Sequence, residues 1–527
     1  MNLTSIEKKV IKNTLLTNSN CLQTKERSHS HMSLFSRQSK QCSTIFQADL
    51  SISRSSLFES LLKIKPESKD SFKSLQKTLD ELKPEEVLTL PAEKTVISSL
   101  VIKKSVHIKG VSGSSLVIED SGFHLASPRI KVFISELKVS VTGTSGVLVS
   151  AGEVDLEVAD CVVVGNEENR FISFDDSDGV RMGRVSLSSC DVTGFSEVIK
   201  SSEGCSVLVN RCHLSSCSGH GLFLFSPSLV QITMNLIEKC KKSGIEIVHT
   251  SSKSTSSIKQ DILIEENDIV HNHGPGVSIY SDTFHELSGS ITIKSNKISH
   301  NKKEGISIRH LGTTSLICSN NDFTYNTLSS CWIQKLQHLS NSEFEISSNR
   351  FSDSLLGYGL YVYSAVFTLT KNEIFRNSLG GVFITGKCSS SDLNKNFMIM
   401  SCCIDSNGGN GVEINDFSNS VIVESSKLSE NTKSGLCCMN SLKYETGKTR
   451  VEAKYCEMSC NSEYGVVVVR CRCNFLKLNI TDNSMGEMLF GENSSELVRF
   501  DDRLYSTTSD LIAIKAQKSC RGSCIVY

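Results

Sequence analysis

The sequence predicts an all-β fold, a β-solenoid built from short strands, and three observations support this prediction. A skeleton of Asn, Ile, Asn, Gly and two aliphatic residues recurs in residues 266–280 and 295–309, although the residues between them differ. The skeleton occupies twelve positions from Cys161 to Cys456, which span 295 residues in 11 steps, or about 27 residues per repeat. Each repeat contains short stretches of alternating apolar and polar residues, which are typical of strands. Stacking such repeats about 4.8 Å apart buries a continuous core that no single repeat can bury alone.

The first polar position of the skeleton, which we call the ladder position, holds Asn, Cys or Ser in each of these repeats. Asn tolerates unusual backbone angles at a tight turn, and its side chain can hydrogen-bond to the copies above and below. Cys is interpreted as a small apolar substitute and not as a metal ligand, because these Cys residues lie at least one repeat apart. The predicted structural ladder consists of Asn235, Asn267, Asn296, Asn321, Asn349 and Asn372. The same position is filled by Cys161, Cys190 and Cys212 before it, and by Cys402, Ser426 and Cys456 after it.

The residues around the ladder position indicate which side chains enter the core. Apolar residues five and three positions before it are expected to point inward, because side chains alternate between the two faces of a strand. Phe344, Phe367 and Phe397 share the first of these positions in three successive repeats and are expected to stack. A glycine nine residues after the ladder position, in most repeats, is expected to allow a bend that a side chain would obstruct.

A repeat of about 27 residues with an Asn ladder resembles the single-stranded right-handed parallel β-helix of the pectin-lyase type. Residues 83–95 ("KPEEVLTLPAEKT") and 99–110 ("SLVIKKSVHIKG") are similar to the short helix and first strands of intracellular β-helix proteins. Those proteins include the F-box-only and SHC SH2-domain-binding proteins. The resemblance covers roughly residues 80–500 and implies the fold, whereas the function stays open because such folds serve both as lyases and as binding modules.

Four segments are predicted along the chain. Residues 1–55, with 8 Lys and Arg against 3 Asp and Glu, are interpreted as a disordered basic arm. Residues 56–84 show helical spacing of Leu and Phe and are expected to form a short helical cap over the first coil of the solenoid. The β-helix is expected over residues 85–505, followed by a tail at residues 506–527 in which lipidation of the cysteines is left open.

Charge and cysteine content bear on partners and location. The 56 Lys and Arg nearly balance the 57 Asp and Glu, so no overall field favours nucleic acid. No apolar run approaches the roughly 20 residues that cross a membrane, and no secretory signal is visible at the start of the sequence. The 21 Cys are therefore expected to be reduced, and the predicted location is the cytoplasm, with the nucleus left open. No cofactor and no metal site is predicted.

No catalytic residue is predicted, although the question of an enzyme is left open. The column of outward residues two positions after the turn glycine contains two acids, Glu246 and Glu413, which lie six repeats apart. Six repeats correspond to about 29 Å, too far for the two acids to act together on one bond. His220 belongs to a Gly-His-Gly string, but its second glycine is the turn glycine of the repeat, so the string is interpreted as structural.

The same outward column contains aromatic residues on three successive repeats, Trp332, Tyr361 and Phe383. Adjacent exposed aromatic residues form a patch, and such patches mark interaction sites. The alternative is that an inserted loop covers them. The predicted binding surface, which we call the aromatic stripe, consists of Tyr280, Arg309, Trp332, Tyr361, Tyr363 and Phe383.

Two functions are compatible with these features. The main prediction is a non-catalytic intracellular β-helix scaffold that binds a protein partner along its lateral face, as the resemblance to the intracellular β-helix proteins implies. The alternative is a carbohydrate-active enzyme or a glycan-binding β-helix of the pectin-lyase type, in which the aromatic stripe stacks on sugar faces. The sequence does not choose between a protein and a glycan partner.

Overall fold

The structure, a computed structural model, divides the chain into two units, residues 1–67 and 68–527. The predicted basic arm and residues 56–69 of the predicted cap lie outside the described residues. All described residues belong to the second unit: 70–143, 148–150, 153–174, 183–249, 259–281, 288–311, 314–335, 344–388, 395–441, 449–491, 497–500, 503–506, 513–514, 517–518 and 524–525.

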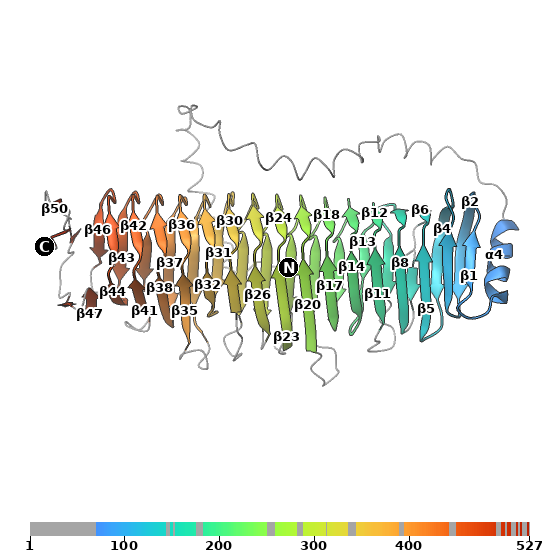
Figure 1. The fold of residues 1–527 in the computed structure, drawn as a ribbon, viewed down its shortest axis with the longest axis horizontal. Helices are drawn as coiled ribbons and strands as arrows, with labels where there is room; N and C mark the ends of the chain where they lie inside the picture. The colour runs from blue at the N-terminus through green and yellow to red at the C-terminus, as the bar shows by residue number, and fades with distance from the viewer. Residues whose placement is uncertain are drawn as a thin grey trace, which may run out of the picture. The chain divides into compact units, whose positions relative to one another are not determined.

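The second unit is a stack of coils (Figure 1). The first two coils contain two strands each, β1 with β2 and β3 with β4, and the following coils contain three. From β5 to β46 each strand pairs in parallel with the third strand along the chain, which gives fourteen three-stranded coils in the described residues. Three parallel sheets result. The described residues contain a single helix, α4 (Asp70–Glu81), so the predicted all-β fold is confirmed.

The first sheet contains the strands that precede the ladder position. They are β1 (Val87–Leu90), β3 (Val106–Gly110), β5 (Ile130–Ser135), β8 (Val154–Ala159), β11 (Arg184–Ser188), β14 (Ser206–Asn210), β17 (Leu229–Thr233), β20 (Lys259–Glu265), β23 (Ser288–Lys294), β26 (Ser315–Ser319), β29 (Phe344–Ser347), β32 (Thr368–Thr370), β35 (Asn396–Met400), β38 (Ser420–Glu424), β41 (Arg450–Lys454), β44 (Arg472–Leu476), β47 (Leu497–Phe500) and, antiparallel to it, β48 (Arg503–Ser506).

The second sheet contains mostly three-residue strands that follow the ladder position. They are β2 (Lys94–Ile102), β4 (Ser115–Leu125), β6 (Lys138–Val141), β9 (Val162–Val164), β12 (Asp191–Thr193), β15 (His213–Ser215), β18 (Leu236–Glu238), β21 (Asp268–Val270), β24 (Lys297–Ser299), β27 (Asp322–Thr324), β30 (Arg350–Ser352), β33 (Glu373–Phe375), β36 (Cys403–Asp405), β39 (Lys427–Ser429), β42 (Glu457–Ser459) and β45 (Asn479–Thr481).

The third sheet contains the strands that follow the turn glycine. They are β7 (Leu148–Ser150), β10 (Arg170–Phe174), β13 (Glu197–Lys200), β16 (Leu222–Phe225), β19 (Ile245–His249), β22 (Val277–Ser281), β25 (Ile306–Leu311), β28 (Cys331–Lys335), β31 (Tyr358–Tyr363), β34 (Gly380–Gly386), β37 (Asn410–Phe417), β40 (Leu436–Met439), β43 (Tyr464–Val469) and β46 (Gly486–Phe490), with β49 (Ala513–Ile514) antiparallel to the last. A separate antiparallel pair is formed by β50 (Gln517–Lys518) and β51 (Cys524–Ile525).

The core is a set of columns in which equivalent residues of successive coils stack. The three phenylalanines Phe344, Phe367 and Phe397 lie inside, as expected, at 5%, 3% and 0% exposure. Their ring centroids are 5.5 Å and 5.2 Å apart from one coil to the next. Parallel stacking in register therefore places like side chains on like side chains, which buries the apolar face of every short strand.

The helix α4 covers the first coils. Leu79 on it is buried, and the Gln76 side chain both donates to and accepts from the backbone of Val101 in β2. The helix expected at residues 83–95 is absent, and this prediction is wrong. That segment contains β1, because its alternation of apolar residues points Leu88 and Leu90 into the core while Val87 stays exposed.

Each coil turns corners at residues with left-handed backbone angles. The residue immediately before the ladder position has positive φ, for example Glu266 at 55° and Ser295 at 56°. The unusual backbone angle thus precedes the ladder Asn and does not fall on it, which corrects the reason given for Asn at this position. The turn glycine is required by close packing, because a Cβ on Gly276 would lie 2.5 Å from Ile298 Cγ2.

Candidate functional site

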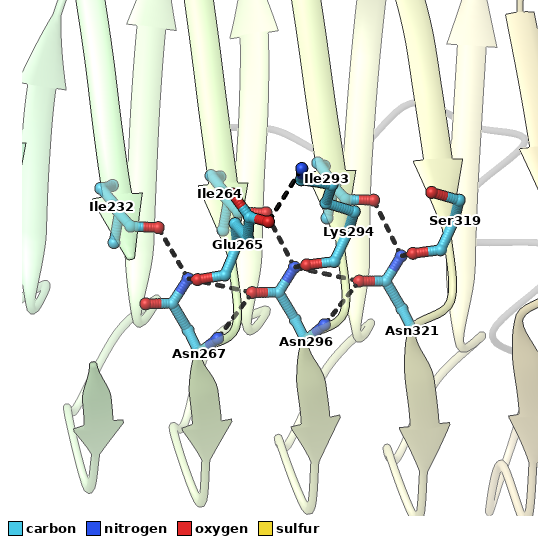
Figure 2. Close-up of polar contacts among 9 residues, drawn as sticks. All are labelled: Ile232, Ile264, Glu265, Asn267, Ile293, Lys294, Asn296, Ser319 and Asn321. Atoms are coloured by element: carbon cyan, nitrogen blue, oxygen red, sulfur yellow. Dashed lines mark hydrogen bonds and ion pairs between the residues drawn. The ribbon is translucent and has the colours of Figure 1, made fainter. Parts of the chain in front are cut away.

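The six predicted ladder asparagines form one continuous column of hydrogen bonds (Figure 2). In each step the backbone N–H and the side-chain Nδ2 of one Asn donate to Oδ1 of the next, for example from Asn267 to Asn296 at 2.9 Å each. The Nδ2 group of Asn267 also donates to the carbonyl of Ile232 in the preceding coil. Each amide is therefore saturated by the coils on both sides, and the column has no free group with which to bind a ligand.

A second asparagine column lies five residues after the first. The sequence shows these residues, but their role as a ladder was not predicted. They repeat the same pattern of bonds, as from Asn272 to Asn301 at 3.0 Å and 3.1 Å. Two runs are present among the described residues: Asn272, Asn301 and Asn326, and then Asn377, Asn407, Asn431, Asn461 and Asn483.

The cysteines of the ladder column are buried free thiols. The backbone N–H of Cys190 points at Cys212 Sγ at 3.5 Å, where an Asn would offer an oxygen. A hydrogen bond with Cys190, together with burial, raises the pKa of the Cys161 thiol, so this thiol is uncharged at neutral pH. In the part of the chain that the structure describes, no group of three or more His, Cys, Asp or Glu residues is arranged to hold a metal ion.

The residues of the aromatic stripe come together on the outer face of the third sheet. The register of β25, β28, β31 and β34 aligns Ser307, Trp332, Tyr361 and Phe383 in one column. Ring centroids are 5.5 Å apart between Trp332 and Tyr361, and 5.2 Å apart between Tyr361 and Phe383. The Tyr358 ring adds to the group, because it lies 4.9 Å from that of Phe383.

A second column runs beside the first and carries the other stripe residues. In it, Tyr280 pairs with Arg309, Arg309 with Gln334, and Gln334 with Tyr363. The Arg309 guanidinium carbon lies 3.9 Å from the centroid of the Trp332 ring, which is a cation–π contact. The structure thus brings all six predicted residues to one face.

The exposure of the stripe bears on whether it can bind. Trp332, Tyr361 and Phe383 are each half-buried, partly by one another. The indole Nε1 of Trp332 is buried and has no hydrogen-bond partner among the described residues. The two insertions that could cover the stripe include residues 282–287 and 389–394, which lie outside the described residues. The exposed stripe therefore stays a prediction.

An acid that sequence reasoning missed lies on the same face. Glu304 precedes the turn glycine Gly305, so it is three residues away from the outward column in which acids were sought. Its side chain is 3% exposed, Oε1 lies 3.8 Å from Arg309 Nη2, and Oε2 has no hydrogen-bond partner. Burial raises the pKa of Glu304, while Arg309 and Lys303 act in the opposite direction.

Glu246 lies two coils before Glu304 and is held differently. Its Oε2 accepts a hydrogen bond from Ser243 Oγ at 2.7 Å and lies 3.9 Å from His220 Nδ1. Burial raises the pKa of Glu246, and the hydroxyls of Ser243 and Ser278 oppose that rise. Burial and the charge of Lys242 lower the pKa of His220 to about 4, so this imidazole is neutral at pH 7.

The column before the turn glycine places the two acids on the same part of this face. Ser243, Pro275 and Glu304 occupy equivalent places in successive coils, because the turn glycines of the preceding coils donate to their carbonyls. The Glu246 carboxylate bends back onto Ser243, and so onto the column of Glu304. Two coils correspond to about 10 Å along the stack. Glu413, in contrast, lies six coils from Glu246 and accepts from Asn410 Nδ2 at 2.9 Å.

The stacked parallel sheets, with stabilising ladders inside and a polar and aromatic outer face, define a protein of the β-helix class. The chain belongs to the family described as having a right-handed β-helix region, whose model matches residues 98–262, 257–337 and 335–501. The predicted right-handed parallel β-helix of the pectin-lyase type is thereby confirmed. No helix among the described residues has the length and apolar character needed to cross a membrane.

Solved structures with a similar fold include alginate and mannuronan C-5 epimerases. The periplasmic alginate epimerase AlgG is 15% identical, with 64% of this chain and 77% of that chain covered and a TM-score of 0.37. The A-module of the Azotobacter vinelandii mannuronan C-5 epimerase AlgE6 is 10% identical, with 67% and 90% covered and a TM-score of 0.35. The A-module of AlgE4 from the same organism is 12% identical, with 83% and 95% covered and a TM-score of 0.25. A search of curated protein sequences gave no match.

These comparisons correct the main functional prediction. The main prediction was a non-catalytic scaffold for a protein partner, and it is corrected here, because the epimerases named above fit the glycan alternative better. One physical reason is that acids were sought in a single outward column, and Glu304 lies in the neighbouring one. At such low identities and TM-scores the similarity shows the fold alone, and a function on glycans has to be argued from the residues of the face.

Proposed function

We propose that the chain binds a carbohydrate chain along the outer face of the third sheet, between β16 and β37. The observation that carries this proposal is the column of Trp332, Tyr361 and Phe383 on three successive coils. A sugar ring presents apolar C–H groups on its faces and hydroxyls on its edge. Aromatic rings with polar groups beside them match both parts of such a ligand.

Polar groups without partners beside the stripe support a glycan over a purely apolar ligand. Among the described residues, the buried side-chain atoms that lack a hydrogen-bond partner include Trp332 Nε1, Glu304 Oε2 and His220 Nδ1, all on this face. Buried polar atoms are almost always paired in folded proteins, so unpaired ones call for an explanation such as a ligand. The hydroxyls of a sugar can both donate and accept, and can therefore satisfy each of the three.

The repetition of the face supports a polymer over a single sugar. Equivalent outward positions recur about every 4.8 Å, once per coil. A chain of sugars laid along the stack therefore meets a new set of side chains at each coil, with acids and His220 toward β16 and aromatic rings toward β34.

The test uses the fluorescence of Trp332, the single Trp of the chain. Full-length protein is titrated with soluble cello-, xylo-, manno-, chito- and galacturono-oligosaccharides. We expect at least one of them to shift the emission of Trp332 saturably. The double variant Tyr361→Ser, Phe383→Ser should weaken that affinity about tenfold or more, because a few aromatic residues carry most of the energy of an interface.

A matched control separates binding from general damage. Tyr325 and Tyr455 are exposed at 46% and 54% and belong to the corners of the coils, away from the stripe. The double variant Tyr325→Ser, Tyr455→Ser should bind the oligosaccharide as the unchanged protein does. An emission that responds to none of the probes, or a stripe variant that binds as tightly as the control, contradicts the proposal.

A further inference from the structure

We propose that Glu304 and Glu246 are the general acid and the general base of a site that hydrolyses the glycan bound on this face. The inference rests on the proposed function. It adds a chemical reaction to the glycan-binding surface proposed above. It stands on the position of the two acids in neighbouring columns two coils apart, on their different surroundings, and on the contact that joins Glu304 to the aromatic stripe through Arg309.

The two carboxyls have the surroundings that their roles require. Glu304 receives no hydrogen bond at Oε2 and is almost completely buried, which favours the protonated form that can donate. Glu246 accepts from Ser243, and its neighbours His220 and Ser278 are polar. Hydrogen bonds donated to a carboxylate stabilise its charged form, which is the form that takes up a proton. Burial raises the pKa of both acids, and what separates them is the neighbourhood: Glu304 Oε2 has no partner, whereas Glu246 Oε2 accepts from Ser243, so Glu304 is assigned as the acid and Glu246 as the base.

Their separation fits a particular reaction. The two acids lie two coils apart, which is about 10 Å along the stack, at the upper end of the separation that leaves room for a water molecule between base and sugar. Glu304 would give its proton to the glycosidic oxygen as the bond from that oxygen to the anomeric carbon breaks. Glu246 would take a proton from a water whose oxygen bonds to the same carbon. One water is consumed, and two shorter glycans leave, the new reducing end with inverted configuration.

Arg309 links cleavage to binding. Its guanidinium lies 3.9 Å from the centre of the Trp332 ring and 3.8 Å from Glu304 Oε1, so it covers both groups in this structure. The side chain is 36% exposed and Nε donates to Ser307 Oγ, so it can leave without opening the core. A sugar that stacks on Trp332 takes the place of the guanidinium and uncovers Glu304. The acid would thus meet substrate only when the stripe is occupied.

The test follows the fate of the oligosaccharide that shifts Trp332 emission. We expect full-length protein to release new reducing ends from it. Glu304→Gln and Glu246→Gln should each slow that release about 100-fold or more, as the loss of a general acid or base does, while the binding midpoint moves less than about threefold. The control is Glu345→Gln, because Glu345 is an exposed acid on β29 of the first sheet, outside the proposed binding face. It should cleave at the unchanged rate.

Two further readouts keep the inference open to refutation. Proton NMR of the fresh product should show inversion at the anomeric carbon, and retention or an unsaturated product of elimination would overturn the assignment. A bound oligosaccharide that is never shortened, or Gln variants of Glu304 and Glu246 that cleave as fast as Glu345→Gln, would overturn it while leaving the binding proposal intact. If Glu304→Gln lowers the melting temperature, its cleavage rate is set aside, and the cleavage rate of Glu246→Gln alone tests the assignment. If no probe binds, the proposed function fails first and this inference falls with it.

Discussion

The coils from Asn235 to Asn372 and the coils from Cys161 to Cys212 have the same backbone but different ladders. In the first region the backbone N–H of every ladder Asn from Asn235 to Asn349 meets the amide oxygen of the next at 2.9 Å, whereas in the second the N–H of Cys190 meets a thiol sulfur at 3.5 Å. Both kinds of side chain are buried. The comparison shows that the fold needs only a small residue at this position, and that Asn adds bonds between coils that Cys cannot make.

The difference matters because of where the candidate site lies. The coils that carry the ladder from Asn235 to Asn372 are those whose third strands run from β19 to β34. These strands, or the turns just before them, carry Glu246, Glu304, Trp332 and Phe383. The coils with the strongest ladder therefore hold most of the candidate site, and a tightly bonded ladder keeps the outer side chains at a fixed spacing.

The largest expected effect is that of breaking the ladder in its middle. Asn296→Ala removes an oxygen that accepts from both the N–H and Nδ2 of Asn267, and leaves the buried Asn267 N–H without a partner. We expect the free energy of unfolding to fall by about 2–4 kcal/mol, from lost hydrogen bonds and an unsatisfied buried donor. Cys190→Ala, its counterpart in the other region, should cost about 1 kcal/mol or less. Urea unfolding of the two variants measures both, and equal losses would contradict the comparison.

A pH titration probes the junction of the two regions. His213, on β15, lies between Asp191 at 3.1 Å and Glu238 at 3.3 Å, on the coils before and after it. Burial by itself lowers the pKa of His213, but the two acids outweigh it and raise that pKa to about 9. Because the folded pKa exceeds the unfolded value of 6.5, the stabilisation is complete below pH 6.5 and disappears as the pH rises through 9. We expect a loss of about 1–3 kcal/mol over that window.

The control for this titration is His213→Gln, which cannot gain a proton. Its free energy of unfolding should lack the contribution of His213 at pH 6.5 and should approach that of the unchanged protein near pH 9. If the free energies of unfolding of the two proteins ran parallel from pH 6.5 to pH 9, the ion pairs of His213 with Asp191 and Glu238 would contribute nothing to stability.

A smaller effect is expected from extending the asparagine ladder by one coil. Cys212 already donates its N–H to Asn235 Oδ1 at 2.8 Å, so Cys212→Asn would place a new amide directly beneath the existing column. Its oxygen could accept from the N–H of Cys190 in place of the thiol. We expect a gain of about 0.5–1 kcal/mol in thermal or urea unfolding, the net value of one added hydrogen bond. A lower free energy of unfolding for Cys212→Asn would show that burying an amide in these coils costs more than the added hydrogen bond contributes.

The sequence allowed the fold to be predicted more fully than the site. The repeat spacing, the inward phenylalanines and the turn glycines follow from strand alternation and stacking, which are local and periodic. The helix expected at residues 83–95 failed because the pairing of β1 with β3 overrides local preference. The left-handed backbone angle one residue before the ladder position, as at Ser295, could not be predicted from the sequence, because many residue types occupy that position.

Only part of the candidate site could be predicted from the sequence. Trp332, Tyr361 and Phe383 could be aligned because they fall at one offset in the repeat. Glu304 could not be connected with Glu246 in this way, because the two acids stand at different offsets of the repeat, and the bend of the Glu246 side chain onto Ser243 cannot be predicted from spacing. Glu304 stands at the position before the turn glycine. A comparison of repeats that included this position would have shown both acids.

The most direct test of a glycan-binding face on the asparagine-laddered coils is a calorimetric titration. The oligosaccharide selected by Trp332 emission is titrated into full-length protein and into the triple variant Trp332→Ser, Tyr361→Ser, Phe383→Ser. We predict saturable binding to the first and none to the second, with melting temperatures within a few degrees because the three side chains are only half-buried. A triple variant that stays folded and binds with unchanged affinity would contradict the account.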